Sequence, residues 1–451
     1  MLVIRYFATS DGVNLDTSIS PDFWDLGPLT LEQLDANVLA YNRRVKFVLE
    51  QGSRFRAYSN PHARASLGYH VVDQVTVYEQ TPPGKAIGDD GGHAIHEPDW
   101  FEIFERLNVR HYVEDLGVKE VWVWTGGLGA WPSFDPLVHS YDDFRGGWES
   151  NMSSPLTGDI SNSNRDGTDL PVYDRTYVVY GYNFRRSQAE AVHDHGHQIE
   201  SQFAHVNWLQ DGNSDLFWKR WRGQDENGTK VTGRCGDTHS PPNTLDDYDY
   251  ENPALVESDI ADWTPDHSGA TALVNVDTWG ALAFDWPDGD GAFSQRVETQ
   301  WYLYWMMSMP GFANGLHDGA DAITNWWRFV GDWDGSLTGG IGLHDTFEQV
   351  GVGGAGAASE PLALSRVMPN PARYGATVEM RLGAATRLTA GVYDLQGRRV
   401  RALCDGPALA GAGRITWDLR DDAGVRVAPG VYLLRAGVPG HALTRKLCVV
   451  R

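Results

Sequence analysis

The chain has 451 residues, and its 60 acidic against 37 basic residues give a formal net charge of -23. This excess of negative charge argues against a nucleic-acid binder, because phosphate contacts need clustered Lys and Arg. Hydrophobic residues make up 41% of the chain, enough for a folded core, and no run approaches the ~18 apolar residues of a membrane span. Three cysteines exclude a disulfide-dense scaffold. These features are typical of a soluble extracellular protein or of one that binds divalent cations.

The composition divides the chain into three parts. All of the 18 Trp except Trp417 precede residue 334. Residues 335–360 are rich in Gly and Ala and poor in large apolar side chains, which is typical of a linker. We therefore expect a core domain over 1–334, a linker over 335–360 and a small domain over 361–451.

Strands and helices alternate over the first 210 residues. The patterns predict strands at 2–8, 70–79, 119–127 and 176–184, and helices at 30–52, 99–116 and 187–206. Thr30 and Gln33 form a capping-box pattern at the first helix. Such alternation favours an α/β fold with a mostly parallel, doubly wound sheet. Residues 210–334 form a loop-rich, aromatic extension with one strong helix at 293–309.

The third predicted helix carries the sharpest chemical pattern. At 100° per residue, Glu190, His193, His197 and Glu200 lie within about 80° of one another on one face. The opposite face is apolar, so the stripe is expected to point away from the sheet. His193 and His197 have the i,i+4 spacing that lets two imidazoles share a tetrahedral metal ion, and Glu200 or Glu190 would add an oxygen ligand. The alternative is a solvated polar face with no ligand.

This helix resembles, in part, the H-E-x-x-H helix of zinc peptidases. The position of the glutamate is taken by Asp194, whose shorter side chain reaches less far toward a metal-bound water. We therefore consider Glu149 as well as Asp194 for the general base. Arg165 or His239 would stabilise the developing negative charge.

Two polar loops supply further candidate residues. Ligands bind at the carboxyl ends of strands in such sheets, and a long polar loop follows the third strand. It contains Glu149, Asn151, Asp159, Asn162, Asn164, Arg165 and Asp166. The second loop contains Asp237, His239, Asn243, Asp246, Asp247, Asp249 and Glu251. Calcium is a second possible ion, because the acidic runs 246–251 and 288–291 offer oxygen ligands, although neither has EF-hand spacing.

The tryptophans fall into two groups. Those in apolar runs are predicted to be core residues: Trp122, Trp124, Trp301, Trp305, Trp326 and Trp327. Trp131, Trp148, Trp263 and Trp286 stand in polar loops beside Pro, Gly or Asp. Exposed aromatic side chains of that kind suit stacking on sugar rings.

The last part of the chain is a succession of short strands separated by turns. The strands are ATVEMRL, RLTAGVYDL, RRVRALC, GRITWDL, GVYLLRA and TRKLCVV, which predicts an all-β sandwich of about ninety residues. The runs PNPARYGATVEMRL, VYDLQGRRVRAL, ITWDLRDDAGVRVAPGVYLLRA and TRKLCVVR resemble the FlgD-like immunoglobulin-type module. In many bacteria that module is the sorting domain of type IX secretion. The resemblance implies contact with secretion machinery and export to the medium or the cell surface.

Two features qualify this resemblance. Cys404 and Cys448 stand where such modules usually have aliphatic residues, so they are either small buried hydrophobes or a disulfide. At the other end, MLVIRYF lacks the basic segment and cleavage site of a signal peptide.

The core also resembles a family of secreted bacterial proteins that has no assigned activity. The stretches that carry this resemblance are WESNM, GDISNSNRD, YGYN, HGHQIE, PPNT, DYDY and FVGDWD. The resemblance therefore supports secretion and adds nothing about chemistry.

Three functions remain open at this stage. The first is a secreted hydrolase of an extracellular peptide or glycan polymer, with zinc or a similar divalent ion on His193 and His197. The second is a surface protein that binds glycans through loop aromatics, with calcium in a structural role. The third is a metal-free glycosidase that uses Glu149 and Glu200 as its two carboxylates.

Overall fold

The computed structural model consists of two compact units, Met1–Phe347 and Glu348–Arg451. It describes residues 1–18, 27–90, 93–126, 150–161, 169–287, 297–344, 362–364, 372, 375–382, 384–394, 397–408, 411–439 and 441–450. No helix among these residues is both long enough and apolar enough to cross a membrane.

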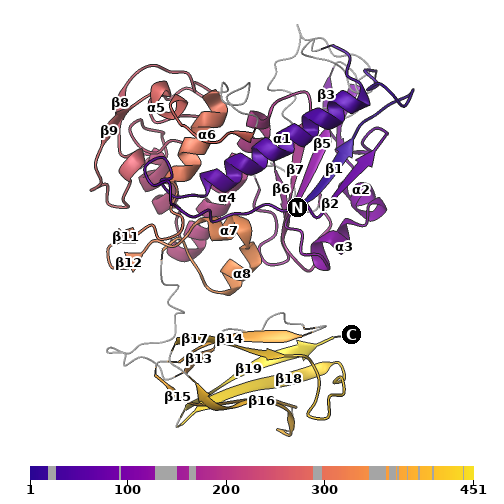
Figure 1. The fold of residues 1–451 in the computed structure, drawn as a ribbon, viewed down its shortest axis with the longest axis vertical. Helices are drawn as coiled ribbons and strands as arrows, with labels where there is room; N and C mark the ends of the chain where they lie inside the picture. Colours follow the sequence, from indigo (N-terminus) through magenta and orange to yellow (C-terminus); the bar gives the residue numbers. More distant parts are fainter. Residues whose placement is uncertain are drawn as a thin grey trace. The chain divides into compact units, whose positions relative to one another are not determined.

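A five-stranded mixed sheet organises the first unit (Figure 1). Its strands are β1 (Leu2–Tyr6), β2 (Asp73–Val77), β5 (Glu120–Thr125), β6 (Asn151–Ser153) and β7 (Tyr177–Asn183), in the order β2-β1-β5-β7-β6. β1 pairs in parallel with β2 and β5, and β5 pairs in parallel with β7. The edge strand β6 runs antiparallel to β7, in a segment for which the sequence analysis predicted only loop. The four predicted strands are therefore present, and the sheet is mostly parallel.

Helices cover both faces of this sheet. One face packs against α1 (Leu31–Gly52) and α4 (Gln188–Asp211) through a core that includes Trp122 and Tyr180. The other face packs against α2 (Trp100–Arg106) and α3 (Val109–Glu114) through Val121 and Val179. Alternate residues of each strand thus enter different cores, as the pleat of a strand requires. The strand order reverses between β1 and β5, so successive parallel strands are added on both sides of β1.

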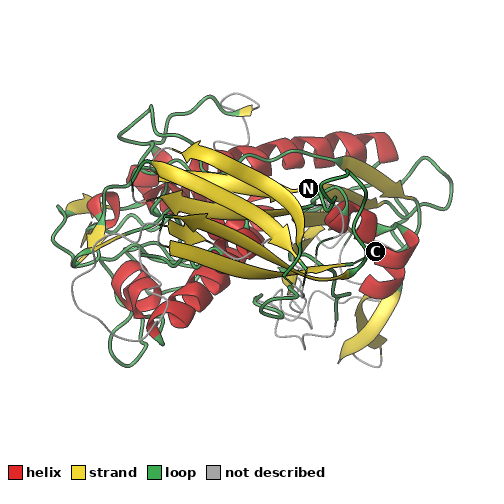
Figure 2. Ribbon diagram, turned by 90° about the horizontal axis from the view of Figure 1, so that it is seen from below, coloured by secondary structure: helices red, strands yellow, loops and turns green. Residues whose placement is uncertain are grey.

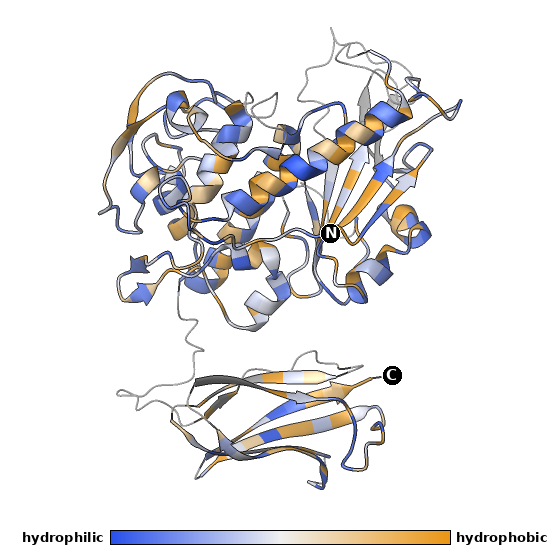
Figure 3. Ribbon diagram, viewed as in Figure 1, coloured by the Kyte–Doolittle hydropathy of each residue, from blue (hydrophilic) through white to orange (hydrophobic). Residues whose placement is uncertain are grey.

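The first two predicted helices differ in how well they match the structure. α1 begins with the predicted capping box, in which Thr30 and Gln33 satisfy each other's backbone N–H groups. Apolar and polar residues alternate along α1 (Figure 3). The predicted helix 99–116 is instead two short helices, because Asn108 between them has left-handed backbone (φ 50°). In the first of these helices Phe101 is 51% exposed, whereas Ile103 is buried.

The remaining elements of the first unit are short apart from α6. They are β3 (Pro83–Asp90), β4 (His93–Pro98), η2 (Leu216–Gly223), β8 (Val256–Ser258), η3 (Ile260–Asp262), β9 (Ala272–Val274), α5 (Val276–Gly280), α6 (Val297–Ser308), β11 (His317–Asp318), β12 (Asp321–Ala322), α7 (Trp327–Gly331) and α8 (Trp333–Thr338). α8 and the residues up to His344 belong to this unit, with Leu343 fully buried, although the sequence analysis placed 335–344 in the linker. The rest of the predicted linker lies outside the described residues.

Tryptophan burial corrects one prediction. The six tryptophans predicted to be core residues are fully buried. Trp263 and Trp286, predicted as exposed loop aromatics, are also buried, at 0% and 7% exposure. Trp263 packs within the core and donates its indole N–H to the Arg220 carbonyl (2.8 Å). Trp131 and Trp148 lie outside the described residues.

The second unit consists of antiparallel strands (Figure 2). One sheet has the order β13-β14-β17 and the other β16-β15-β18-β19. The strands are β13 (Leu362–Leu364), β14 (Ala376–Leu382), β15 (Thr386–Tyr393), β16 (Arg399–Ala408), β17 (Gly411–Trp417), β18 (Gly430–Val438) and β19 (His441–Val449). Both sheets contribute to one hydrophobic core that includes Val378, Val392 and Trp417. The predicted all-β organisation of this region is confirmed.

The two cysteines of this unit are not joined in a disulfide. Cys404 lies on β16 and Cys448 on β19, the opposite edge strands of the four-stranded sheet. Three interstrand spacings of ~4.8 Å place them about 14 Å apart or more, whereas disulfide-bonded residues have Cα atoms within ~7 Å of each other. The disulfide alternative is therefore wrong.

Candidate metal centre

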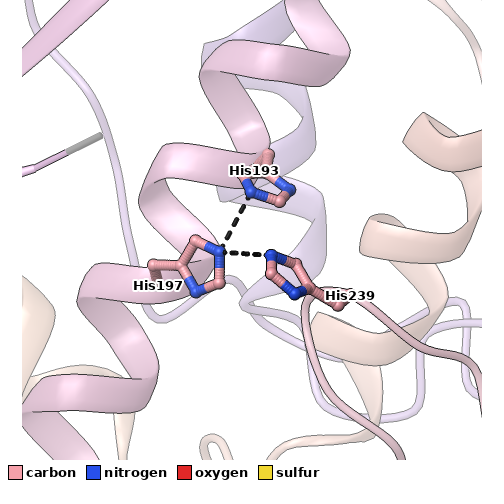
Figure 4. A group of neighbouring side chains, drawn as sticks. All are labelled: His193, His197 and His239. Carbon is pink, nitrogen blue, oxygen red and sulfur yellow. Dashed lines mark hydrogen bonds between the residues drawn. The ribbon is translucent and has the colours of Figure 1, made fainter. Parts of the chain in front are cut away.

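Three histidine side chains converge between α4 and the loop that follows η2 (Figure 4). His197 Nε2 lies 3.0 Å from His193 Nε2 and 3.0 Å from His239 Nε2. The three nitrogen atoms all lie within 4.8 Å of one another. We call His193, His197 and His239 the histidine cluster. It is the one group of three or more possible metal-binding side chains found in the part of the chain that the structure describes.

Glu200 anchors the far side of the His197 ring. Its Oε2 is 3.0 Å from His197 Nδ1, and its Oε1 accepts a hydrogen bond from the Thr238 backbone N–H (2.9 Å). Burial acts to raise the pKa of Glu200, but the hydrogen bonds from His197 and Thr238 outweigh it and lower the pKa to about 2. An ionised Glu200 accepts the proton of His197 Nδ1, which leaves the lone pair on His197 Nε2 pointing into the cluster.

A chain of hydroxyl groups fixes the His193 ring in the same way. Tyr250 donates its hydroxyl proton to the Thr238 carbonyl (3.0 Å), so it can only accept from Tyr302 (2.8 Å). Tyr302 has then used its own proton and must accept from His193 Nδ1 (2.9 Å). This order of donors places the proton of neutral His193 on Nδ1 and the lone pair on Nε2.

Two lone pairs therefore face each other across the 3.0 Å between His193 Nε2 and His197 Nε2. Two acceptors at that distance repel unless a proton or a cation lies between them. In a tetrahedral zinc site with Zn–N bonds of ~2.05 Å, neighbouring ligand nitrogens are about 3.3 Å apart. Burial and the neighbouring His197 lower the pKa of His239, which favours the neutral ring that a metal needs. The geometry and the proton positions thus fit a divalent cation.

The helix face that carries the cluster is covered by protein, so it is not the solvated polar face named above as the alternative. His193, His197 and Glu200 are 6%, 9% and 7% exposed. The covering loop approaches α4 at Gly196, where a methyl group would stand 2.7 Å from Thr238 Oγ1 and 2.8 Å from Thr238 Cγ2. A glycine at this position lets the loop come close enough for His239 to reach the helix.

Tryptophans of α6 hold the covering loop from its other side. The indole N–H of Trp301 donates to the Asp237 carbonyl (3.2 Å), and that of Trp305 donates to the Gly236 carbonyl (3.3 Å). Asp237 also forms an ion pair with Arg222 of η2. The backbone next to His239 is thus fixed by α6 and by η2.

Glu190 and Asp194 do not join the cluster. Glu190 pairs with Arg186, one helical turn earlier. Asp194 is 2% exposed, and its charge adds to burial and to Glu120 in raising the pKa of Tyr180, which lies on the sheet. Neither residue belongs to the group of side chains whose possible ligand atoms converge.

His195 lies on the opposite side of α4, in what we call the sheet-side cluster. This cluster consists of Tyr69, Glu120, Trp122, Tyr180, Tyr182 and His195. The His195 ring stacks on Tyr180 with 3.7 Å between centroids, and its Nε2 is 2.7 Å from the Tyr182 hydroxyl. Burial lowers its pKa well below the ordinary value. His195 is a core histidine.

The remaining predicted residues have other places. Glu149, Asn162, Asn164, Arg165, Asp166 and the acidic run 288–291 lie outside the described residues. Asn243 holds its own loop by donating to the carbonyls of Asn252 and Ala254. The run 246–251 includes exposed Asp246 and Asp247, and no group of three converging carboxylates is found among the described residues.

Several residues that support the cluster have no chemical pattern in the sequence that predicts their role. Tyr302 and Trp301 belong to a helix that is buried on all sides, so its pattern indicated only core. Tyr250 and Thr238 stand in an acidic loop, for which the sequence predicted carboxylate ligands of calcium. His239 was predicted to stabilise charge, yet it lies beside His193 and His197. The spacing of 42 residues between His197 and His239 carries no periodic signal.

No family model matches this chain, and no curated protein matches it. Among solved structures, it is similar to latent PorU of Porphyromonas gingivalis at 28% identity, over 21% of this chain and 10% of PorU, with a TM-score of 0.18. It is similar to PorZ, a surface component of the type IX secretion system of the same organism, at 26% identity over 22% and 13%, with a TM-score of 0.16. FlgD of Xanthomonas campestris matches at 25% identity over 19% and 64%, with a TM-score of 0.15. The chain spans about a tenth of the first two proteins, and these TM-scores carry no argument about function.

Proposed function

We propose that the first unit is a metal-dependent hydrolase of an extracellular peptide or glycan polymer. His193, His197 and His239 would hold a divalent ion, with zinc the best fit to three imidazole ligands. The observation that carries the proposal is the convergence of three imidazole nitrogens, two of which have lone pairs fixed by Glu200 and Tyr302.

The ligand set determines the chemistry that such an ion supplies. Three neutral imidazoles leave its double positive charge uncompensated, so it would lower the pKa of a bound water and polarise a substrate carbonyl or acetal oxygen. The chain keeps Glu200 bound to His197 and Thr238, so Glu200 orients a ligand and is not available as a free base. Two exposed polar residues lie beside His239: Asp247, 3.7 Å from its Nδ1, and Tyr248, whose hydroxyl is 3.1 Å from its Nε2.

Metal analysis of the purified full chain tests this proposal. We expect one equivalent of zinc in the wild type after chelation, reloading and desalting, and loss of it in His197→Ala. The same preparations are then assayed on peptide and glycan polymers, where chelation should abolish cleavage and zinc should restore it. A matched control is His195→Phe, which changes a neighbouring histidine outside the cluster and should keep its metal. A wild type that binds no divalent ion would refute the proposal and leave a proton shared between His193 and His197.

For the second unit we propose an immunoglobulin-type sandwich that acts as an export signal. The proposal is supported by the resemblance of residues 361–451 to FlgD-like sorting modules and by the two antiparallel sheets around one core. β19 carries the terminal TRKLCVV sequence as an edge strand with Lys446 exposed, where secretion machinery could pair with it. The expected location is the medium or the cell surface.

A fusion tests the export proposal. Residues 348–451 are joined to a signal peptide and a fluorescent reporter in a host with type IX secretion. The reporter should leave the periplasm, and deletion of 441–451 should retain it there. Equal retention of both fusions would leave the unit with no sorting role.

A further inference from the structure

Tyr248 stands at the exposed side of the histidine cluster, in the loop that carries His239. Its hydroxyl oxygen is 3.1 Å from His239 Nε2. Its ring centroid is 4.5 Å from that of His239 and 5.9 Å from that of His193, at 25° to the His193 ring. The residue is 38% exposed, so its ring covers the cluster on one side and meets solvent on the other.

The backbone at Tyr248 adopts a conformation that a tyrosine rarely takes. Its φ of 64° lies in the left-handed region, where the backbone of a non-glycine residue is strained. The conformation is held by a 2.7 Å hydrogen bond from the Tyr248 N–H to the His239 carbonyl, and by buried Tyr250 two residues later. The loop thus holds Tyr248 in a strained backbone conformation, in which its ring lies over the cluster.

A cation in the cluster changes what the Tyr248 hydroxyl can do. Once the lone pair of His239 Nε2 is bound to an ion, that nitrogen no longer accepts a hydrogen bond. The Tyr248 oxygen nevertheless remains 3.1 Å from it, close to the ~3.3 Å that separates two ligand atoms of one tetrahedral ion. The separation from His239 Nε2 is thus the one expected between two ligands of the same ion.

We propose that Tyr248 supplies the fourth ligand of the metal centre in the resting protein and gives way to substrate. This inference rests on the metal site proposed above. Coordination through the phenol oxygen releases the hydroxyl proton to water, and when a substrate oxygen displaces the phenolate, the phenolate takes a proton back from water. Because the ring is partly exposed, it can turn into solvent without leaving a cavity in the core. In this role Tyr248 occupies the fourth coordination position of the ion until a substrate oxygen displaces it.

Copper loading tests the ligand assignment directly. Full-length wild type, Tyr248→Phe and the control Tyr78→Phe, which alters another exposed tyrosine, are each loaded with one equivalent of Cu²⁺. Imidazole sites bind Cu²⁺ strongly, and a phenolate bound to Cu²⁺ gives a charge-transfer band in the visible region. We expect this band in the wild type and in Tyr78→Phe, and its complete loss in Tyr248→Phe, with one copper bound in all three.

Failure of the Tyr248 assignment and failure of the metal site would give different results. One tightly bound copper in the wild type without the charge-transfer band overturns the role of Tyr248 and leaves the histidine site intact. No tightly bound copper in the wild type overturns the metal site itself, and the role of Tyr248 with it. If Tyr248→Phe does not fold, as judged by circular dichroism, the wild-type spectrum still decides between these outcomes.

Discussion

The two sides of α4 carry buried histidines in different environments. On the side toward the sheet, His195 stacks on Tyr180 and bonds to Tyr182, within the aromatic sheet-side cluster. On the other side, His193 and His197 direct nitrogens toward each other and toward His239. Both sides are buried and both are hydrogen-bonded, so neither property separates a ligand from a core residue. What separates them is the direction of the lone pairs, which the outer hydrogen bonds of each ring determine.

The largest expected effect concerns the stability of the sheet side. His195→Ala removes a fully buried ring and its bond to Tyr182, and should cost about 2–4 kcal/mol of unfolding free energy. Metal stoichiometry should not change. Denaturant unfolding together with metal analysis checks both statements. Loss of metal from a folded His195→Ala protein would contradict the expectation that only the side of α4 with His193 and His197 binds the ion.

Gly196 lies between the two sides and should affect the histidine cluster more than the fold. Gly196→Ala gains about 1 kcal/mol of helix propensity, but its methyl group meets Thr238 at 2.7 Å and overpacking costs ~1–3 kcal/mol. We expect the free energy of unfolding to fall by about 1 kcal/mol. Zinc should bind at least ~10-fold more weakly, because the loop that carries His239 is pushed outward. Competition with a chromophoric chelator measures the affinity.

A double variant provides the control for that experiment. Thr238→Ala removes the two atoms nearest to the added methyl group, so Gly196→Ala/Thr238→Ala should recover part of the lost affinity. Purely additive effects of the two substitutions would show that the close approach of the loop does not position His239.

Glu120 gives the sheet side a dependence on pH. Burial raises the pKa of Glu120 to about 7, against 4.5 in an unfolded chain, although it accepts hydrogen bonds from Trp122 and Tyr69. The folded protein therefore keeps a proton that the unfolded chain releases, so this contribution is complete below pH 4.5 and is lost as the pH rises through 7. Glu120→Gln should remove roughly 1–3 kcal/mol of the stability difference between pH 5 and pH 8. Parallel pH profiles of wild type and variant would contradict this expectation.

The smallest expected effect concerns the support of His193. Tyr302→Phe removes the acceptor of His193 Nδ1, and should weaken zinc binding about 10-fold with the fold retained. The control is Tyr58→Phe, which removes another α6-contacting hydroxyl, bonded to Ser308 (3.2 Å) and distant in the chain from the cluster. An equal loss of affinity in both variants would indicate a general loosening of α6.

A sequence pattern predicted an element well when the whole pattern lay within one continuous segment. The Thr30–Gln33 capping box fixed the start of α1, and the β-branched and aromatic run of 119–127 predicted β5. Helical periodicity also separated His195 from His193 and His197. The break at Asn108 was not predicted, because an asparagine in a sequence can adopt either the helical or the left-handed conformation.

Burial of the histidine cluster was beyond sequence reasoning for a different reason. It depends on the loop around Thr238 folding over α4, and the loop is held by Trp301 and Trp305 from a helix some sixty residues later. Trp263 shows the same limit, since a polar neighbourhood in the sequence does not exclude a buried position in space. Contacts between distant segments decided which side chains met.

With the proposed ion bound, the span between His197 and His239 would link the cluster to the lifetime of the protein. An ion shared by residues 42 positions apart closes a loop of the chain, as a removable cross-link would. At a free metal concentration 100 times the dissociation constant, such binding adds about 2.7 kcal/mol to stability. Where zinc is scarce, this loop would open more often and proteases would reach it sooner. The scarcity of one nutrient ion would then set how long each molecule survives.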